Sequence, residues 1–193
     1  MKYKIIKNFL SDDKNKELLK RTLDIKGWKD STIINTTSNY RKSKVIYHLD
    51  NDIIVLFEQK IKELYKDVLS ELDMKDFDIS KIEMQMTSSN NGDFFKVHPD
   101  ADYKRGRGDV KNRKLTFVYY YFTDPKPFTG GNLKIYEFSD DSRTTHNSLE
   151  FDTVVPENNM LIFFESDYWH EVEEVICEPS LENSRFTINS WIQ

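Results

Sequence analysis

From residue 79 onward the sequence alternates between short apolar runs and turn formers, and this pattern restricts the fold more than any other feature. The runs are rich in β-branched and aromatic residues, which are typical of strands. Turn formers such as Asn90, Asn91 and Gly92 separate them. Such a series favours an antiparallel double sheet of the jelly-roll type. The predicted strands cover residues 79–87, 93–98, 114–123, 132–138, 151–155, 160–164, 171–176 and 185–192.

The first 78 residues differ in pattern and predict two helices, after a short strand within residues 3–9. Ser11 is a candidate N-cap, and Asp12 and Asp13 place negative charge in the first turn. Residues 31–50 are polar and define no element. A second, amphipathic helix is indicated by apolar residues at i, i+3 and i+4 spacing, namely Ile53, Leu56, Phe57, Ile61, Leu64, Tyr65 and Leu69.

Length and composition indicate one globular domain. The chain has 193 residues, of which 38% are hydrophobic and 32% charged. We expect a helical N-terminal support region in residues 1–78, packed on one sheet of a β core in residues 79–193. The net charge of −5 gives no argument for a nucleic-acid or membrane partner. A single cysteine, Cys177, excludes an intrachain disulfide, so we expect a cytoplasmic location. The oligomeric state is not indicated.

A candidate metal site comes from His98, Asp100 and His170. In an extended segment, residues i and i+2 project to the same face, so His98 and Asp100 can reach one ion. Pro99 between them favours extended geometry. Two histidines and one carboxylate on one side of an ion leave open positions on the other. That arrangement is typical of oxygen-activating non-haem iron.

Other interpretations of these residues stay open at this point. A His-x-Asp motif by itself is weak, and a histidine on a strand is often structural. Three ligands with an open position also suit zinc, although the sequence contains no HExxH motif of a zinc protease. We expect the remaining histidines, His48 and His146, to be exposed or structural.

The final predicted strand carries a candidate carboxylate anchor. Alternation places Arg185, Thr187, Asn189 and Trp191 on one face, and arginine can bind a carboxylate through two parallel hydrogen bonds. A surface ion pair of Arg185 with Glu182 is the alternative. On the predicted strand 114–123, Tyr119 and Tyr121 share one face and Tyr120 takes the other.

Together these segments resemble the prolyl 4-hydroxylase-like branch of the 2-oxoglutarate/Fe(II)-dependent oxygenases. The resemblance covers roughly residues 80–193 and implies a double-stranded β-helix. It also implies iron on His98, Asp100 and His170, with Arg185 binding the distal carboxylate of 2-oxoglutarate. It further implies that Tyr121 assists Arg185, and that the cosubstrate pocket is lined by Leu133, Asn189 and Trp191. The matching segments are residues 91–100, 113–122, 130–136, 155–164, 170–172 and 185–191.

Two departures from the family pattern stand out. A tyrosine often precedes the His-x-Asp strand and reaches the cosubstrate, but here the region contains Thr87 and Ser88. Residues 177–182 form an apparent loop insertion before Arg185, which could shape the substrate entrance. The basic segment 102–113 also follows Asp100 directly, and it is either a lid or a solvated loop.

The resemblance implies a dioxygenase that hydroxylates a C–H bond and releases succinate and CO2. Its cofactors would be Fe(II), 2-oxoglutarate and O2, with ascorbate as a further one to consider. The expected substrate is a prolyl or other residue in a peptide or protein. Alternatives are a hydroxylase of a free amino acid or small metabolite, a cupin-type metal-dependent hydrolase or isomerase, and a non-catalytic jelly-roll binding module.

Overall fold

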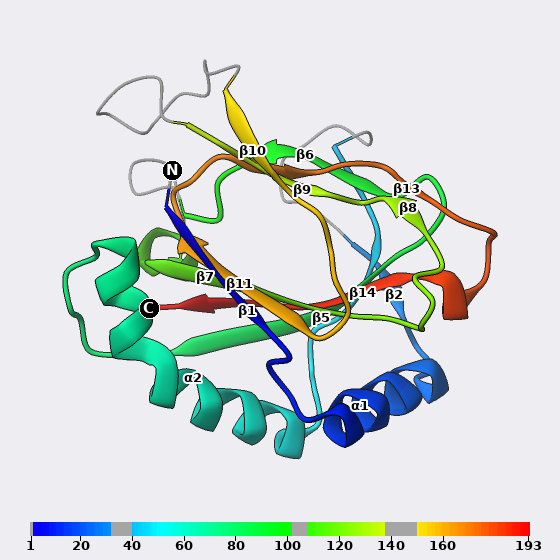
Figure 1. Cartoon of the computed structure of the whole chain (residues 1–193), viewed down its shortest axis with the longest axis horizontal. Coiled ribbons are helices and arrows are strands. Elements are labelled where there is room, and N and C mark those ends of the chain that lie inside the picture. The colour runs from blue at the N-terminus through cyan, green and yellow to red at the C-terminus, as the bar shows by residue number, and fades with distance from the viewer. Residues whose placement is uncertain (1, 32–39, 102–107, 138–149) are drawn as a thin grey trace.

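The computed structural model describes residues 2–31, 40–101, 108–137 and 150–193. Within these residues the elements form three layers (Figure 1). A smaller sheet lies over a larger one, and both helices cover the opposite face of the larger sheet. This is the jelly-roll arrangement, with helices on one sheet, that the sequence predicted.

The larger sheet contains the strands that carry most of the core. In the described part of the chain it has seven strands, and neighbouring strands are antiparallel. In spatial order they are β1 (Tyr3–Lys7), β11 (Met160–Glu165), β7 (Leu115–Tyr121), β14 (Arg185–Ile192), β5 (Ile82–Ser89), β4 (Lys44–Ile46) and β2 (Lys29–Asp30).

The smaller sheet carries the two histidines of the candidate metal site. Among the described residues it has five strands, in the order β10 (Phe151–Val154), β9 (Leu133–Tyr136), β12 (His170–Val172), β6 (Phe94–His98) and β3 (Arg41–Lys42). A separate pair joins β13 (Val175–Ile176) to β8 (Thr129–Gly130). The predicted strand 171–176 is therefore two short strands, because the chain leaves β9 after Val172 and pairs with β8 instead.

Both predicted helices form, and the first begins at its predicted N-cap. Helix α1 (Asp12–Asp24) begins where the Ser11 hydroxyl accepts a hydrogen bond from the Lys14 amide. Helix α2 (Asn51–Leu72) ends at Asp73, whose left-handed backbone closes the last turn. The remaining helical turns are the 3-10 segments η1 (Gly108–Asn112) and η2 (Leu181–Asn183). No described helix is long and apolar enough to cross a membrane.

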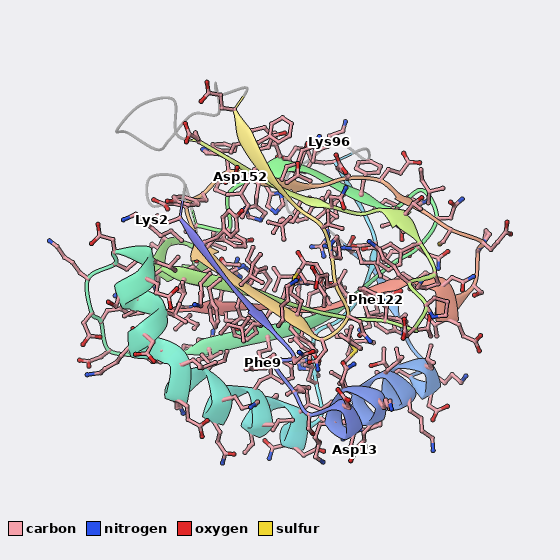
Figure 2. All side chains as sticks on the ribbon, in the orientation of Figure 1. Lys2, Phe9, Asp13, Lys96, Phe122 and Asp152 are labelled. Carbon is pink, nitrogen blue, oxygen red and sulfur yellow. The ribbon has the colours of Figure 1, made fainter. Side chains whose placement is uncertain are left out.

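The larger sheet separates two hydrophobic cores, one on each face. The first joins the helices to the larger sheet and includes Phe9, Phe57 and Tyr121. The second lies between the two sheets and includes Tyr120 and Leu133. Figure 2 shows side chains filling both spaces, with Phe9 on the helix side. Since the second core covers part of the space between the sheets, the rest of that space is available for a site.

The N-terminal third does more than support the core with helices. Strand β1 extends the larger sheet at one edge, and β4 and β2 extend it at the other. Strand β3 pairs with β6 in the smaller sheet. The polar segment 31–50, which predicted no element, therefore supplies β3 and β4 and connects the two sheets. Polar side chains are compatible with these strands, because one face of an antiparallel sheet can be exposed to water.

Candidate active site

A pocket opens between the two sheets and is lined by residues from both. Arg185, Thr187, Asn189 and Trp191 of β14 all line it, as the alternation of that strand predicted. The intervening Phe186 and Ile188 belong to the core on the helix side. One strand therefore provides a polar wall to the pocket and an apolar face to the core.

The three candidate metal ligands meet in this pocket. Their nearest ligand atoms all lie within 4.8 Å of one another. His98 Nε2 is 4.0 Å from Asp100 Oδ1, and His170 Nε2 is 3.5 Å from Asp100 Oδ2. His98 ends β6 and His170 begins β12, where the two residues are paired across the strands. The antiparallel register therefore brings together residues that are far apart in sequence.

Backbone carbonyls orient both imidazole rings. His98 Nδ1 lies 2.7 Å from the carbonyl oxygen of Lys96, and His170 Nδ1 lies 2.8 Å from that of Tyr168. With a proton on Nδ1, each ring donates to the carbonyl and presents the Nε2 lone pair to the shared space. Burial lowers the pKa of His98 well below its ordinary value, and the neighbouring His170 adds to this effect. The neutral, metal-binding form of His98 is thereby favoured.

Residues of β7 and the segment before it hold Asp100. The Thr116 hydroxyl donates to Asp100 Oδ2 at 3.0 Å, and Ser166 Oγ lies 2.9 Å from the same hydroxyl. Arg113 donates to the Asp100 carbonyl at 3.2 Å, makes a two-point contact with Glu83 and stacks over the Trp191 ring at 4.0 Å. These supporting groups were not identified from the sequence, because they come from other strands.

Arg185 is fully enclosed on the pocket face of β14. The residue is only 3% exposed, and none of the described carboxylates lies within ion-pair distance of it. Its Nε makes no hydrogen bond to a described residue. The surface ion pair with Glu182 does not form. A buried cation in these surroundings is a candidate binding site for an anion.

The tyrosine beside Arg185 is Tyr120, so the prediction for Tyr121 is wrong. The Arg185 guanidinium carbon is 4.9 Å from the Tyr120 ring centroid, and the buried Tyr120 hydroxyl has no described hydrogen-bond partner. Tyr121 faces the helices, where its hydroxyl lies 3.1 Å from Thr22 Oγ1. The register explains the difference, since Tyr120 is paired with Thr187 on the pocket face and Tyr121 with Phe186 on the other.

Comparison with known proteins assigns the chain to a family. The model of the family described as the 2OG-Fe(II) oxygenase superfamily matches residues 84–193. An uncharacterised PKHD-type hydroxylase of Synechocystis is 36% identical over 197 residues, which cover 99% of this chain. The chain belongs to the 2OG-Fe(II) oxygenase superfamily. The chain spans 63% of the length of its Synechocystis relative.

Solved structures agree with the fold. A Pseudomonas putida prolyl 4-hydroxylase aligns with a TM-score of 0.69 at 17% identity, over 99% of this chain and 91% of that one. A Trichoplax adhaerens prolyl hydroxylase, in complex with a hypoxia-inducible-factor peptide fragment, aligns with a TM-score of 0.68 at 17% identity. That alignment covers 98% of this chain and 82% of the other. At this identity the two structures show the shared fold.

The pocket residues fit the cofactors that the superfamily name implies. Two imidazoles and a carboxylate on one side are the donor set that suits Fe(II). The buried Arg185 guanidinium, which has no described carboxylate at ion-pair distance and lies beside the Tyr120 ring, suits an anion with hydrogen-bond acceptors, such as the distal carboxylate of 2-oxoglutarate. His98, Asp100 and His170 would therefore hold Fe(II), and Arg185 with Tyr120 would hold the cosubstrate.

Gly131 makes room for the Arg185 side chain, and Gly130 makes room for the backbone of Glu174. Gly130 and Gly131 have backbone φ angles of +65° and +63°, which side-chain-bearing residues rarely adopt. A Cβ on Gly131 would lie 2.9 Å from Cδ of Arg185. Leu133, two residues on, lines the pocket as predicted. Gly131 thus permits close packing of this turn against the arginine.

Of the other residues that the sequence analysis named, some line the pocket and others lie elsewhere in the molecule. Thr87 lines the pocket and accepts a hydrogen bond from Asn189 at 2.7 Å, whereas Ser88 is paired with Phe186 on the opposite face. The loop 177–182 packs on the turn that contains Asn90 and Asn91, and none of its described residues lines the pocket. His48 is exposed. His146, residues 102–107 of the basic loop and residues 139–149 lie outside the described residues.

Proposed function

We propose that the chain is an Fe(II)- and 2-oxoglutarate-dependent dioxygenase that hydroxylates a C–H bond in a peptide or protein, with a prolyl residue as the first candidate. One observation carries the proposal. The pocket holds a His-Asp-His ligand set and an enclosed Arg185 that no described carboxylate neutralises. A metal site alone would also suit zinc hydrolysis, and a binding module would need neither feature. The combination suits a metal and a dicarboxylate cosubstrate bound together.

In this reaction the protein's own residues would bind the metal and the cosubstrate and exclude water from the pocket. When bound, Fe(II) with 2-oxoglutarate and O2 supplies the oxidising chemistry that an unactivated C–H bond requires. His98 and His170 present their Nε2 lone pairs, and Asp100 is held in place by Thr116. Apolar side chains from Phe95, Val118 and Val172 line the pocket and exclude water. Arg185 would fix one end of the cosubstrate so that its keto acid faces the ligand set.

The substrate class is inferred from relatives. The Trichoplax structure contains a peptide fragment bound to a prolyl hydroxylase of the same fold. The Synechocystis relative is named a hydroxylase. A free amino acid or small metabolite remains the alternative substrate, and a substrate screen separates the two.

The test begins with binding and ends with turnover. Anaerobic addition of Fe(II) and 2-oxoglutarate should produce a weak visible charge-transfer band, and aerobic incubation should form succinate. We expect His98→Ala and Asp100→Ala to lose both signals, while the matched control His48→Ala, at an exposed position, keeps them. If either His98→Ala or Asp100→Ala formed succinate at the wild-type rate, the metal assignment would be wrong.

A substrate screen completes the test. Proline-containing peptides and free amino acids are incubated with the protein, iron and 2-oxoglutarate, and mass spectrometry detects the addition of one oxygen atom. Addition to a peptide supports the proposal. Addition to free amino acids alone would replace it with the small-molecule alternative.

A further inference from the structure

A second arginine, Arg41, lies in the same pocket but on a different strand. It begins β3, the edge strand of the smaller sheet, and lines the pocket together with His98. Its cross-strand partner is Phe95 of β6. Arg41 comes from the N-terminal third, outside the residues that the family model matches. Arg41 is not one of the three metal ligands, and it is not part of the proposed cosubstrate site at Arg185.

The contacts of Arg41 fix its position relative to the metal ligands. Its guanidinium carbon lies 4.7 Å from the centroid of the Phe95 ring, and that ring stacks on the His98 ring at 3.4 Å. Arg41 is thus one aromatic ring away from a metal ligand. Its Nε donates to the Ser43 hydroxyl at 3.0 Å, and Ser43 in turn donates to Ser31 at 3.0 Å. One edge of the guanidinium is therefore held, and its two terminal nitrogens make no hydrogen bond to the part of the chain that the structure describes.

Among the described residues, Arg41 has no carboxylate at ion-pair distance. The next residue, Lys42, by contrast pairs with Asp93 at 3.3 Å. Burial lowers the pKa of Arg41, and the electrostatic effects of Tyr47 and Asp100 only partly oppose this. Asp100 is already bound by Thr116 and belongs to the metal ligand set. A half-buried guanidinium that is fixed in a ligand pocket costs folding free energy unless a bound anion compensates its charge.

We propose that Arg41 is a specificity-determining residue that binds a carboxylate of the substrate. This inference rests on the proposed function and names the chemistry of the substrate that enters the pocket. Two terminal nitrogens in one plane match the two oxygens of a carboxylate. The carboxylate is either the side chain of an acidic residue beside the target in a peptide or the α-carboxylate of a free amino acid. In both cases Arg41 orients the substrate over Phe95, toward the ligand set.

Paired probes test this without turnover. The protein is loaded with Fe(II) and 2-oxoglutarate under anaerobic conditions, and binding is measured by titration calorimetry. The first pair is acetyl-Glu-Pro-Gly-amide and acetyl-Gln-Pro-Gly-amide, and the second is L-proline and L-prolinamide. We expect the carboxylate member of one pair to bind about 10- to 100-fold more tightly than its amide partner, as a charged hydrogen-bonded contact would give. The pair that shows the preference identifies the source of the carboxylate.

Three variants assign the preference to Arg41. Arg41→Gln should remove it, and Arg41→Lys should restore only part of it, because a lysine keeps the charge without the planar pair of donors. Lys42→Gln, the neighbouring position with the same charge change, should leave it intact. Circular dichroism checks that each variant is folded, and Arg41→Lys keeps the test valid if Arg41→Gln fails to fold.

Three results would overturn the proposal. The first is that the wild-type protein binds the carboxylate and amide members of both pairs equally well. The second is that Arg41→Gln keeps the wild-type preference for the carboxylate. The third is that Arg41→Gln loses as much affinity for 2-oxoglutarate as for the carboxylate probe. The last would place Arg41 in the cosubstrate site. Failure of the proposed function differs, because the carboxylate preference would persist while no substrate in the screen gains oxygen.

Discussion

At the scale of single residues, the site depends on which face of a strand each side chain takes. Tyr120 and Tyr121 are adjacent and chemically identical, yet one lies beside Arg185 and the other contacts Thr22 under the helices. Burial raises the pKa of both phenols, so both stay protonated near neutral pH and can donate a hydrogen bond. Of the two, only Tyr120 lies beside Arg185 on the face of β7 that is turned toward the smaller sheet.

Substitution of the two tyrosines should therefore have separable effects. We expect Tyr120→Phe to raise the Kd for 2-oxoglutarate about tenfold, since it removes a donor from the cosubstrate end of the pocket. Tyr121→Phe should leave that Kd unchanged and lower the free energy of unfolding by about 1 kcal/mol, through loss of the Thr22 contact. Calorimetric titration and urea unfolding measure the two quantities. The opposite assignment of effects would restore the role predicted for Tyr121.

The close approach of Gly131 to Arg185 leads to a second residue-scale prediction. In Gly131→Ala the new methyl group would lie 2.9 Å from Arg185 Cδ, so the guanidinium must move. We expect the Kd for 2-oxoglutarate to rise about tenfold, because a displaced donor loses hydrogen-bond geometry.

The control for Gly131 is Gly108→Ala. Gly108 has a similar φ of +59°, but a Cβ there would meet no heavy atom within 4 Å. Both variants share the cost of backbone strain, and only Gly131→Ala crowds the arginine. Equal 2-oxoglutarate affinities in the two variants would argue against the positioning role.

At the scale of elements, the antiparallel pairing of β6 with β12 brings the two histidines of the metal site together. The two helices pack on the other face of the larger sheet and contact each other through side chains. Arg21 of α1 reaches across to the start of α2, where it contacts Asp50 at 2.5 Å and Asp52 at 2.6 Å. Its hydrogen bonds lower the pKa of Asp52 from 3.8 to about 2. This contact joins the two helices at the solvent-facing side.

The sign of that shift predicts how stability depends on pH. Because the pKa of Asp52 is lower in the folded state, its contribution is present above about pH 4 and disappears as the pH falls toward 2. Arg21→Gln should lower the Tm by about 2 °C at pH 6, as expected for an exposed pair, with little effect near pH 2. The neighbouring exposed Lys20→Gln should change the Tm little at either pH. A difference for Arg21→Gln that is the same at pH 6 and pH 2 would contradict this account.

At the scale of the whole molecule, the larger sheet separates the helix-side core, which stabilises the fold, from the pocket. Its helix-facing side belongs to the core with Phe57 and Phe117, and its other side lines the pocket at Thr116 and Val118. Changes in the helix-side core should therefore affect folding more than ligand binding.

Phe57 tests that division. It is completely buried, and its ring lies 5.2 Å from Tyr119 and 6.2 Å from Phe117. Phe57→Ala should lower the free energy of unfolding by about 3–5 kcal/mol, with an unchanged Kd for 2-oxoglutarate in the folded protein. Val55→Ala, on the exposed side of the same helix, should change stability by less than about 0.5 kcal/mol. A large loss of 2-oxoglutarate affinity in Phe57→Ala would show that the two sides of the sheet are coupled.

The sequence by itself determined the local features of this protein. Capping residues located the first helix, and apolar spacing located the second. Turn formers separated the strands, and alternation placed Arg185, Thr187, Asn189 and Trp191 on one face. The order of motifs was sufficient to indicate the superfamily that the comparisons show. These features depend on residues close together in the chain, so periodicity and capping can reveal them.

Only the tertiary structure decided how distant strands meet. The register of β7 against β14 selected Tyr120 over Tyr121, and alternation alone cannot say which face is inward. The pairing of β3 with β6 brought Arg41 to the pocket from a segment whose polar sequence predicted no element. Thr116 and Arg113 support Asp100 across strands for the same reason. Side chains from separate strands become neighbours only when the sheets form, so their partnership leaves no periodic signal in one sequence.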